Sequence, residues 1–178
     1  GLVALSAGKH LAMVSKEADC VIGPELARRV RRTGLVLTPV DGDQPSLLIG
    51  LLSWARLLGL KVVSAGKFSE YDFIYDRVCG TVSWRGEAIA VPDFADVWLM
   101  PEFGVPETVE ARSEMLQLFP QRTAPDLCEM GVVCNYTDLL PDNPTFHAPH
   151  ARTLEVPEIM RPKTERGILG APGTIDVF

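Results

Sequence analysis

The chain has 178 residues, of which 47% are hydrophobic and 22% charged, and its formal net charge at pH 7 is −6. This charge argues against a nucleic-acid partner, because a phosphate backbone requires clustered lysine and arginine. No apolar run approaches the roughly 20 residues that a membrane span requires, so we also expect no membrane partner.

Helical and strand patterns alternate over the first part of the chain. The opening "GLVALSAGKH" is typical of the end of a helix, and residues 10–15 form a short apolar pattern that predicts a strand. Gly23 and Pro24 are start signals for a helix that Gly34 would end. The apolar run at 35–40 predicts the second strand.

A second helix and a third strand follow. Pro45 suits the first turn of an apolar helix at about 45–58, and residues 60–66 are again apolar. Apolar strands that alternate with helices are typical of a parallel sheet covered on both faces. We therefore expect the three strands to be parallel neighbours, with this helix packed across them.

The pattern changes after residue 66. The segment 81–91 has strand composition, 106–119 and 124–140 are helical in pattern, and the chain after Leu140 is rich in proline and glycine. Such a segment either wraps between domains or forms loops around a site. The sequence predicts two parts, 1–66 and 67–178.

Polar side chains follow each predicted strand at its carboxyl end. Lys16 follows the first strand, Lys67 follows the third, and the loop "VDGDQPS" places Asp41, Asp43 and Gln44 after the second. Ligands of parallel sheets bind at this edge, so we expect these side chains to converge on one cleft. Two simpler interpretations stay open: the aspartates cap the following helix, and the lysines are solvated.

The cysteines and histidines carry weaker signals. Cysteines 20, 79, 128 and 134 are scattered, so we expect reduced thiols in a cytoplasmic protein. His10 is expected to be structural. His147 and His150 lie three apart in a proline-rich loop and lack the carboxylates of a metal site, which favours loop packing; a divalent metal has no support in the sequence.

Four stretches together resemble a known family. They are "AGKHLAMVSKEADCVIGPELAR", "VLTPVDGDQPSLLIGLLSWARLLGLKVVSAGK", "EMGVVCNYTDLLPDNPTFHAP" and "RGILGAPGTIDVF". The chain resembles homoserine dehydrogenase-like NAD(P)-dependent oxidoreductases, in the branch with a C-terminal SAF-type domain that includes deoxyxylulose-phosphate reductoisomerase-like enzymes. The resemblance implies the middle portion of a longer α/β protein. Residues 1–66 would be the C-terminal half of a Rossmann-type nucleotide-binding domain, and 67–178 an α/β catalytic and dimerisation domain.

The resemblance also implies roles for individual residues. Its catalytic residues would be Lys16, Lys67 and Asp43, and Lys16 would contact the cofactor together with Glu17. The implied substrate-binding residues are Asp41, Gln44, Glu129 and Asn135, the last two on a helix that faces the cleft. The segment "PQRTAPDLCEM" departs from the family pattern, in which "DGTK" shortly precedes the glutamate.

The expected function is oxidoreduction of a small polar metabolite, with or without a phosphate group, using NADP or NAD. The expected partners are this small molecule and further copies of the chain, in a homodimer or larger homo-oligomer, because uncovered sheet edges and apolar faces associate. The alternatives are a non-catalytic metabolite-binding domain and a dimerisation domain derived from the same family.

Overall fold

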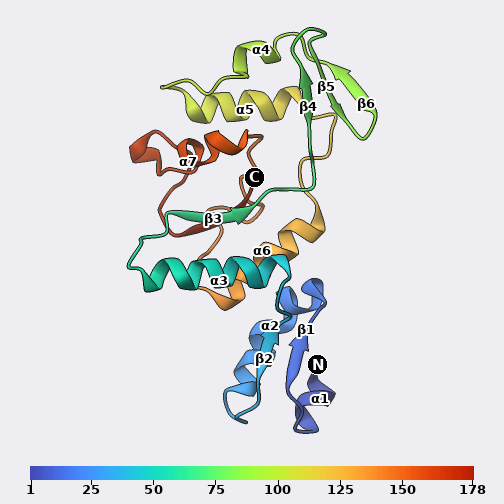
Figure 1. Cartoon of the computed structure of the whole chain (residues 1–178), viewed down its shortest axis with the longest axis vertical. Helices are drawn as coiled ribbons and strands as arrows, with labels where there is room; N and C mark the ends of the chain where they lie inside the picture. The colour runs from blue at the N-terminus through green and yellow to red at the C-terminus, as the bar shows by residue number, and fades with distance from the viewer.

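The computed structural model describes all 178 residues, in three tiers of mixed helix and strand (Figure 1). In chain order the elements are α1 (Leu2–Ser6), β1 (Leu11–Met13), α2 (Lys16–Val30), β2 (Leu37–Pro39), α3 (Gln44–Leu57), β3 (Ser64–Lys67), β4 (Ile74–Asp76), β5 (Thr81–Trp84), β6 (Glu87–Ala90), α4 (Phe94–Val97), α5 (Val105–Met115), α6 (Ala124–Tyr136), η1 (Thr153–Glu155), α7 (Val156–Ile159), η2 (Lys163–Glu165) and β7 (Thr174–Val177).

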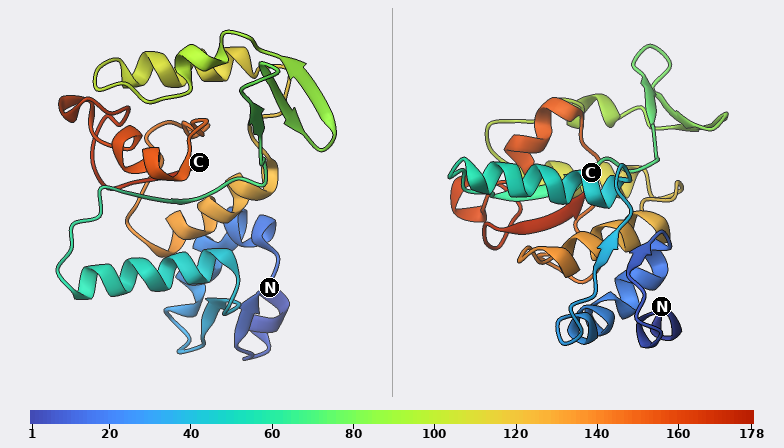
Figure 2. Two further views of the ribbon diagram at one scale, coloured as in Figure 1. Left: turned by 45° about the horizontal axis from the view of Figure 1, so that its top comes forward. Right: turned by 60° about the horizontal axis from the view of Figure 1, so that its bottom comes forward.

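The strands form three small sheets. β1 and β2 pair in parallel, β3 and β7 pair in parallel, and β4, β5 and β6 form an antiparallel sheet. The first pair lies with α1 and α2 at the N-terminal end of the molecule, the second with α3 and α6 in the middle, and the antiparallel sheet with α4 and α5 at the other end (Figures 1 and 2). The α/β class expected from the sequence is confirmed.

The prediction of one three-stranded sheet is wrong. The first two predicted strands are parallel neighbours, but β3 pairs with β7 from the far end of the chain, in the register Ser64 with Thr174. Gly66 makes this close approach possible, because a Cβ at that position would collide with the carbonyl oxygen of Asp176. The first pair is also not covered on both faces, since Ala12 and Thr38 are exposed.

Two helices differ from their predicted positions. α2 begins at Lys16, where the Ser15 hydroxyl accepts a hydrogen bond from the Ala18 amide at 3.3 Å, and the helix continues through Pro24. The proline start signal is therefore overridden by a serine cap more than two turns earlier. α3 packs against α6 and β3 and does not lie across β1 and β2.

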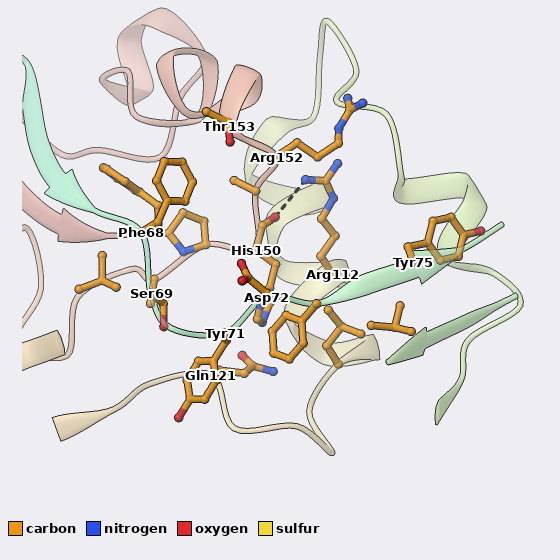
Figure 3. A pocket seen from close by; sticks show the side chains of 18 of the residues that line it. Phe68, Ser69, Tyr71, Asp72, Tyr75, Arg112, Gln121, His150, Arg152 and Thr153 are labelled. Atoms are coloured by element: carbon orange, nitrogen blue, oxygen red, sulfur yellow. Dashed lines mark hydrogen bonds between the residues drawn. The ribbon is translucent and has the colours of Figure 1, made fainter. Parts of the chain in front are cut away.

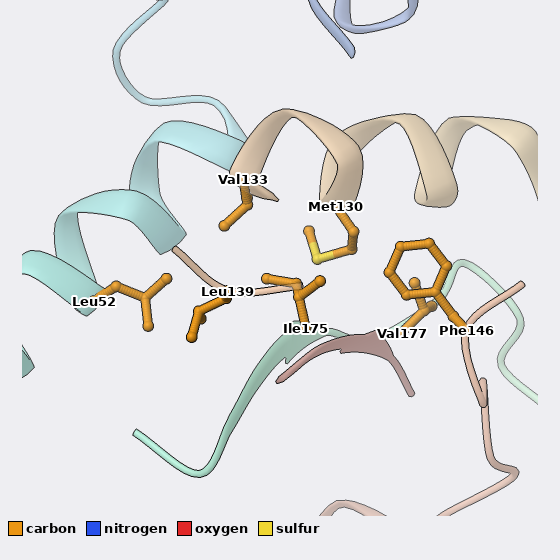
Figure 4. Packing of buried hydrophobic residues seen from close by; sticks show 7 residues of the cluster. All are labelled: Leu52, Met130, Val133, Leu139, Phe146, Ile175 and Val177. Carbon is orange, nitrogen blue, oxygen red and sulfur yellow. The ribbon is translucent and has the colours of Figure 1, made fainter. Parts of the chain in front are cut away.

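Helix α6 is the element around which the molecule is built. It packs against α2, α3 and β7, and it contributes Met130 and Val133 to the main core cluster (Figure 4). Seven buried side chains form this cluster: Leu52, Met130, Val133, Leu139, Phe146, Ile175 and Val177. Two smaller clusters form around α7 and under the antiparallel sheet. No helix has the combination of length and apolar character that a membrane span requires.

Ile175 provides a test of this core. It is fully buried in β7, so Ile175→Ala is expected to lower the free energy of unfolding by about 2–5 kcal/mol through lost burial and a residual cavity. The matched control is Ile74→Ala, because Ile74 is 67% exposed and its truncation should change stability by no more than about 0.5 kcal/mol. Urea unfolding of both variants measures the difference, and equal effects would contradict the assigned core.

Candidate active site

Lys16 lies at the first position of α2, where the chain leaves β1. Its ammonium nitrogen is 2.5 Å from Glu129 Oε1 and 3.2 Å from Asp43 Oδ1. The hydrogen bond that Lys16 donates to Glu129 raises the pKa of Lys16 above its ordinary value, and this outweighs the lowering by burial. Lys16 therefore carries a positive charge at neutral pH. Its side chain is 28% exposed.

Lys67 is the last residue of β3 and is more enclosed. Its ammonium nitrogen donates to Gln44 Oε1 at 3.0 Å, to Asp126 Oδ1 at 2.7 Å and to Glu129 Oε2 at 2.5 Å. Burial lowers the pKa of Lys67, but hydrogen bonds to the two carboxylates outweigh it, and the net pKa lies above its ordinary value. This lysine is therefore held as an ammonium that donates in three directions.

The buried Glu129 carboxylate joins the two lysines, one on each oxygen. Asp126 lies three residues earlier in α6, so both acidic side chains emerge on the same face of the helix. Asp126 Oδ2 accepts from the Ser69 hydroxyl at 2.8 Å. Burial raises the pKa of Asp126, but hydrogen bonds from Lys67 and Ser69 outweigh it and hold the pKa below its usual value.

Both interpretations of Asp43 are compatible with its geometry. Its Oδ1 accepts from the Gln44 amide at 2.9 Å and caps α3, and the same oxygen pairs with Lys16. The corner of the chain at 43–44 thus starts a helix and completes the polar cluster. We call Lys16, Asp43, Gln44, Lys67, Asp126 and Glu129 the lysine–carboxylate cluster.

Three of the predicted site residues lie outside this cluster. Asp41 is exposed and makes no side-chain hydrogen bond or ion pair. Glu17 is exposed and accepts only from the Ser15 hydroxyl, at 3.1 Å. Asn135 does not face the cleft as expected; its amide donates to the carbonyl oxygens of Asp19 and Cys20 and so ties α6 to α2.

The position of Asn135 has a simple cause. Six residues separate it from Glu129, and at about 100° per residue this turns the side chain roughly 240° around the helix. It cannot share the face that carries Glu129. The same arithmetic identifies Asp126, which the sequence analysis missed, as a residue on the Glu129 face. No sequence signal indicates Ser69.

The histidines and cysteines do not form a metal site. No group of three His, Cys, Asp or Glu side chains is close enough to hold a metal ion. His10 Nδ1 accepts from the Val36 amide at 2.9 Å, which is the expected structural role. His147 pairs with Asp142 at 2.8 Å, whereas His150 Nε2 is buried without a hydrogen-bond partner. The four cysteines are free thiols.

A cavity of about 460 Å³, drawn in Figure 3, adjoins the lysine–carboxylate cluster through Ser69. Phe68, Ser69 and residues 71–73 of the chain after β3 line one side, and the loop 148–153 lines another. The proline-rich C-terminal part therefore forms loops around a site, which was one of its two expected roles. Ser69 belongs to both features, because its hydroxyl binds Asp126 and the residue also lines the cavity.

Two partly buried lysines and a buried aspartate, Asp126, with shifted pKa values next to a cavity of this size are typical of an enzyme's substrate site. Residues 42–178 match the model of the family described as "Oxidoreductase DRL, catalytic domain". The match covers most of the chain, and the chain belongs to this family; its general role is therefore that of an oxidoreductase catalytic domain. The matched segment contains every member of the cluster except Lys16. A comparison with curated proteins found no match.

The ion pair of Asp126 leads to a pH-dependent prediction. A carboxyl group whose pKa is lowered on folding stabilises the fold above its unfolded pKa, about 4, and this stabilisation is lost as the pH falls through the folded pKa. Asp126→Asn should therefore lower the free energy of unfolding at pH 7 by about 1.5–3 kcal/mol. The difference from the wild type should shrink below about pH 4.

Denaturant unfolding across this pH range measures the effect. The matched control is Asp138→Asn, because Asp138 is exposed and lies just beyond the same helix. A stability difference for Asp126→Asn that does not vary with pH would show that the carboxylate charge has no part in it.

Proposed function

We propose that the chain is the substrate-binding part of an NAD(P)-dependent oxidoreductase that acts on a small polar metabolite, with or without a phosphate group. The reaction would be of the homoserine dehydrogenase-like or deoxyxylulose-phosphate reductoisomerase-like type. The observation that supports this most strongly is the pair of ammonium groups, Lys16 and Lys67, held by one buried carboxylate at the ends of two strands. Cationic donors fixed in this way suit a carbonyl or hydroxyl oxygen that becomes negative during the reaction.

The nicotinamide cofactor, when bound, supplies or accepts the hydride. Lys16 and Glu17 would hold it, because both lie in the first turn of α2, where free amide groups and the positive end of the helix dipole face outward. Their partial exposure fits this role, since Lys16 keeps its contact with Glu129 while its open side remains available.

Lys67 would act on the substrate oxygen. It is charged at neutral pH, so it donates a hydrogen bond to the oxygen and can deliver a proton as negative charge develops there. Gln44 is its only uncharged partner, and exchange of that contact for the substrate would leave both carboxylate contacts intact. Asp43 and Glu129 orient the lysines. The carboxylates are each occupied by a lysine, which does not fit a divalent metal, and we derive no step through one.

The turnover of a Lys67 variant tests this role. Lys67→Met in the intact protein should lower turnover at least tenfold, since the loss of an acid–base group removes about 10² or more in rate. The matched control is Lys61→Met, because Lys61 is exposed and precedes the same strand. Circular dichroism would verify that both variants are folded. Wild-type turnover of Lys67→Met would refute the assignment.

We also propose that the chain associates with a second copy. Four exposed side chains of α3 and its C-cap, at spacings of four, three and four residues, form one apolar stripe: Leu47, Leu51, Trp54 and Leu58. Each is between 55% and 59% exposed, and a continuous apolar stripe of this kind indicates an interface.

Light scattering tests the association. At micromolar concentration we expect about twice the 19.5 kDa of one chain. Leu51→Glu combined with Trp54→Glu should reduce the mass to that of one chain, whereas Ser53→Glu, on another face of the same helix, should not. A monomeric wild-type chain would contradict the proposal.

A further inference from the structure

The cavity beside the lysine–carboxylate cluster has a character of its own. It is formed by the segment after β3, by the loop that contains His150, and by residues of the antiparallel sheet and α5 (Figure 3). Its volume of about 460 Å³ falls in the range of small-molecule sites. Phe68 and Asp72 line it and are exposed, so the cavity is open to the surface on that side.

Aromatic rings dominate the wall. Phe73 stacks on Phe119 with ring centroids 5.4 Å apart and meets the His150 ring edge-on at 5.2 Å. On the other side, Tyr75 and Trp98 have centroids 5.0 Å apart. These rings hold one another in place, so the cavity offers preformed faces and edges to an apolar or aromatic group.

The wall has no free positive charge in its depth. Arg112 is buried, and it donates to the carbonyl oxygens of Val97, Trp98 and His150 and to the Glu155 carboxylate. Glu155 is also bound by Arg152, which lies over the Trp98 ring. The positive charges of Arg112 and Arg152 are thus balanced by the negative charges of two carboxylates, Glu155 and Asp72. A phosphate or carboxylate deep in the cavity would find no unpaired cation, so a neutral group fits best.

Besides the Tyr75 hydroxyl, His150 is the one polar group of the wall that is buried without a hydrogen-bond partner. Its Nε2 is enclosed by the protein and makes no hydrogen bond, although buried polar groups are normally paired. Burial lowers the pKa of His150 to about 4, so the ring is neutral and can accept or donate one hydrogen bond through each nitrogen. A hydroxyl group on the ligand would satisfy it after a small rotation of the ring.

The cavity and the cluster are parts of one continuous surface. Lys67 and Ser69 both bind Asp126, on its two oxygens, and Ser69 and Tyr71 then line the cavity wall. Tyr71 follows Lys67 by four residues, and four residues span at most about 14 Å even when fully extended. A molecule bound at Lys67 therefore needs only a short chain of atoms to reach the cavity.

We propose that this cavity binds an uncharged aromatic or apolar portion of the substrate, which carries a hydroxyl group for His150 while its reacting polar carbon lies at Lys67. The inference rests on the proposed function for its second half, and it specifies the substrate class: an amphipathic molecule with a polar reacting end and a neutral ring or hydrocarbon end. Loop 148–153 is then the segment that determines specificity.

Binding of simple probes to the intact protein tests the cavity without any turnover. The probes are 2-phenylethanol, ethylbenzene and erythritol, measured by ligand-observed NMR. We expect about millimolar affinity for 2-phenylethanol, as suits a ligand of so few atoms, weaker binding of ethylbenzene and none of erythritol. Absence of binding by both aromatic probes would overturn the proposal.

Filling the cavity locates the binding. Ala151→Phe should weaken 2-phenylethanol at least tenfold, and Ala95→Phe, at an exposed position of α4, should not. Thr153→Phe is a second filling variant; Thr153 lines the cavity but is exposed, so its replacement leaves the core intact if Ala151→Phe fails to fold. Unchanged affinity in a folded filling variant would show that the probe binds elsewhere.

His150→Phe distinguishes the hydrogen bond to the ligand's hydroxyl group from the packing of the ligand's ring. It keeps the ring and removes both nitrogens, so the preference for 2-phenylethanol over ethylbenzene should disappear while ethylbenzene still binds. A retained preference would remove His150 from the proposal. Lys67→Met should bind both probes as the wild type does, so failure of the proposed chemistry and failure of the cavity give different results.

Discussion

The ion pairs of Glu129 are the interaction on which the rest of the structure depends. The buried Glu129 carboxylate binds one ammonium group on each of its oxygens. Lys16 is the first residue of α2, and Lys67 is the last residue of β3, about 50 residues later in the chain. Removal of one partner from such an arrangement leaves a buried charge uncompensated, which costs several kcal/mol. The three elements that carry these residues, α2, β3 and α6, are therefore constrained to meet at this point.

This constraint accounts for the shape of the molecule. The sheets are small, and none extends through more than one tier, so α6 takes over the organising role that a large central sheet has in other α/β proteins. Asp126, Glu129, Met130 and Val133 are spaced i, i+3, i+4 and i+7, so they share one face of α6. The two carboxylates of this face bind the lysines and its two apolar side chains enter the core, whereas Asn135, on another face, binds the backbone of α2. The polar cluster and the main core therefore adjoin each other along one side of the same two helical turns.

Under the proposed function, the cavity extends the same logic to substrate choice. Its polar boundary is Ser69, whose hydroxyl is bound by Asp126, and beyond it the wall becomes aromatic and electrically balanced. A site with a cationic end and a neutral, apolar end discriminates between substrates by both charge and shape. The loop that holds His150 is itself fixed by Asp176 in β7, which accepts from the amides of His147 and Ala148.

The sequence by itself determined the α/β class, most element positions, and five of the residues that meet in the cluster: Lys16, Asp43, Gln44, Lys67 and Glu129. Four of these follow strands or open helices, and local turn chemistry places polar residues there whatever sheet the strand joins; Glu129 came from the family resemblance. Only the tertiary structure decided that β3 pairs with β7, that Asn135 turns away, that Asp126 and Ser69 complete the cluster, and that loop 148–153 closes an aromatic cavity. Strand partners distant in sequence leave no local signal, because their pairing depends on the packing of the whole chain around α6 and not on the residues of either strand alone.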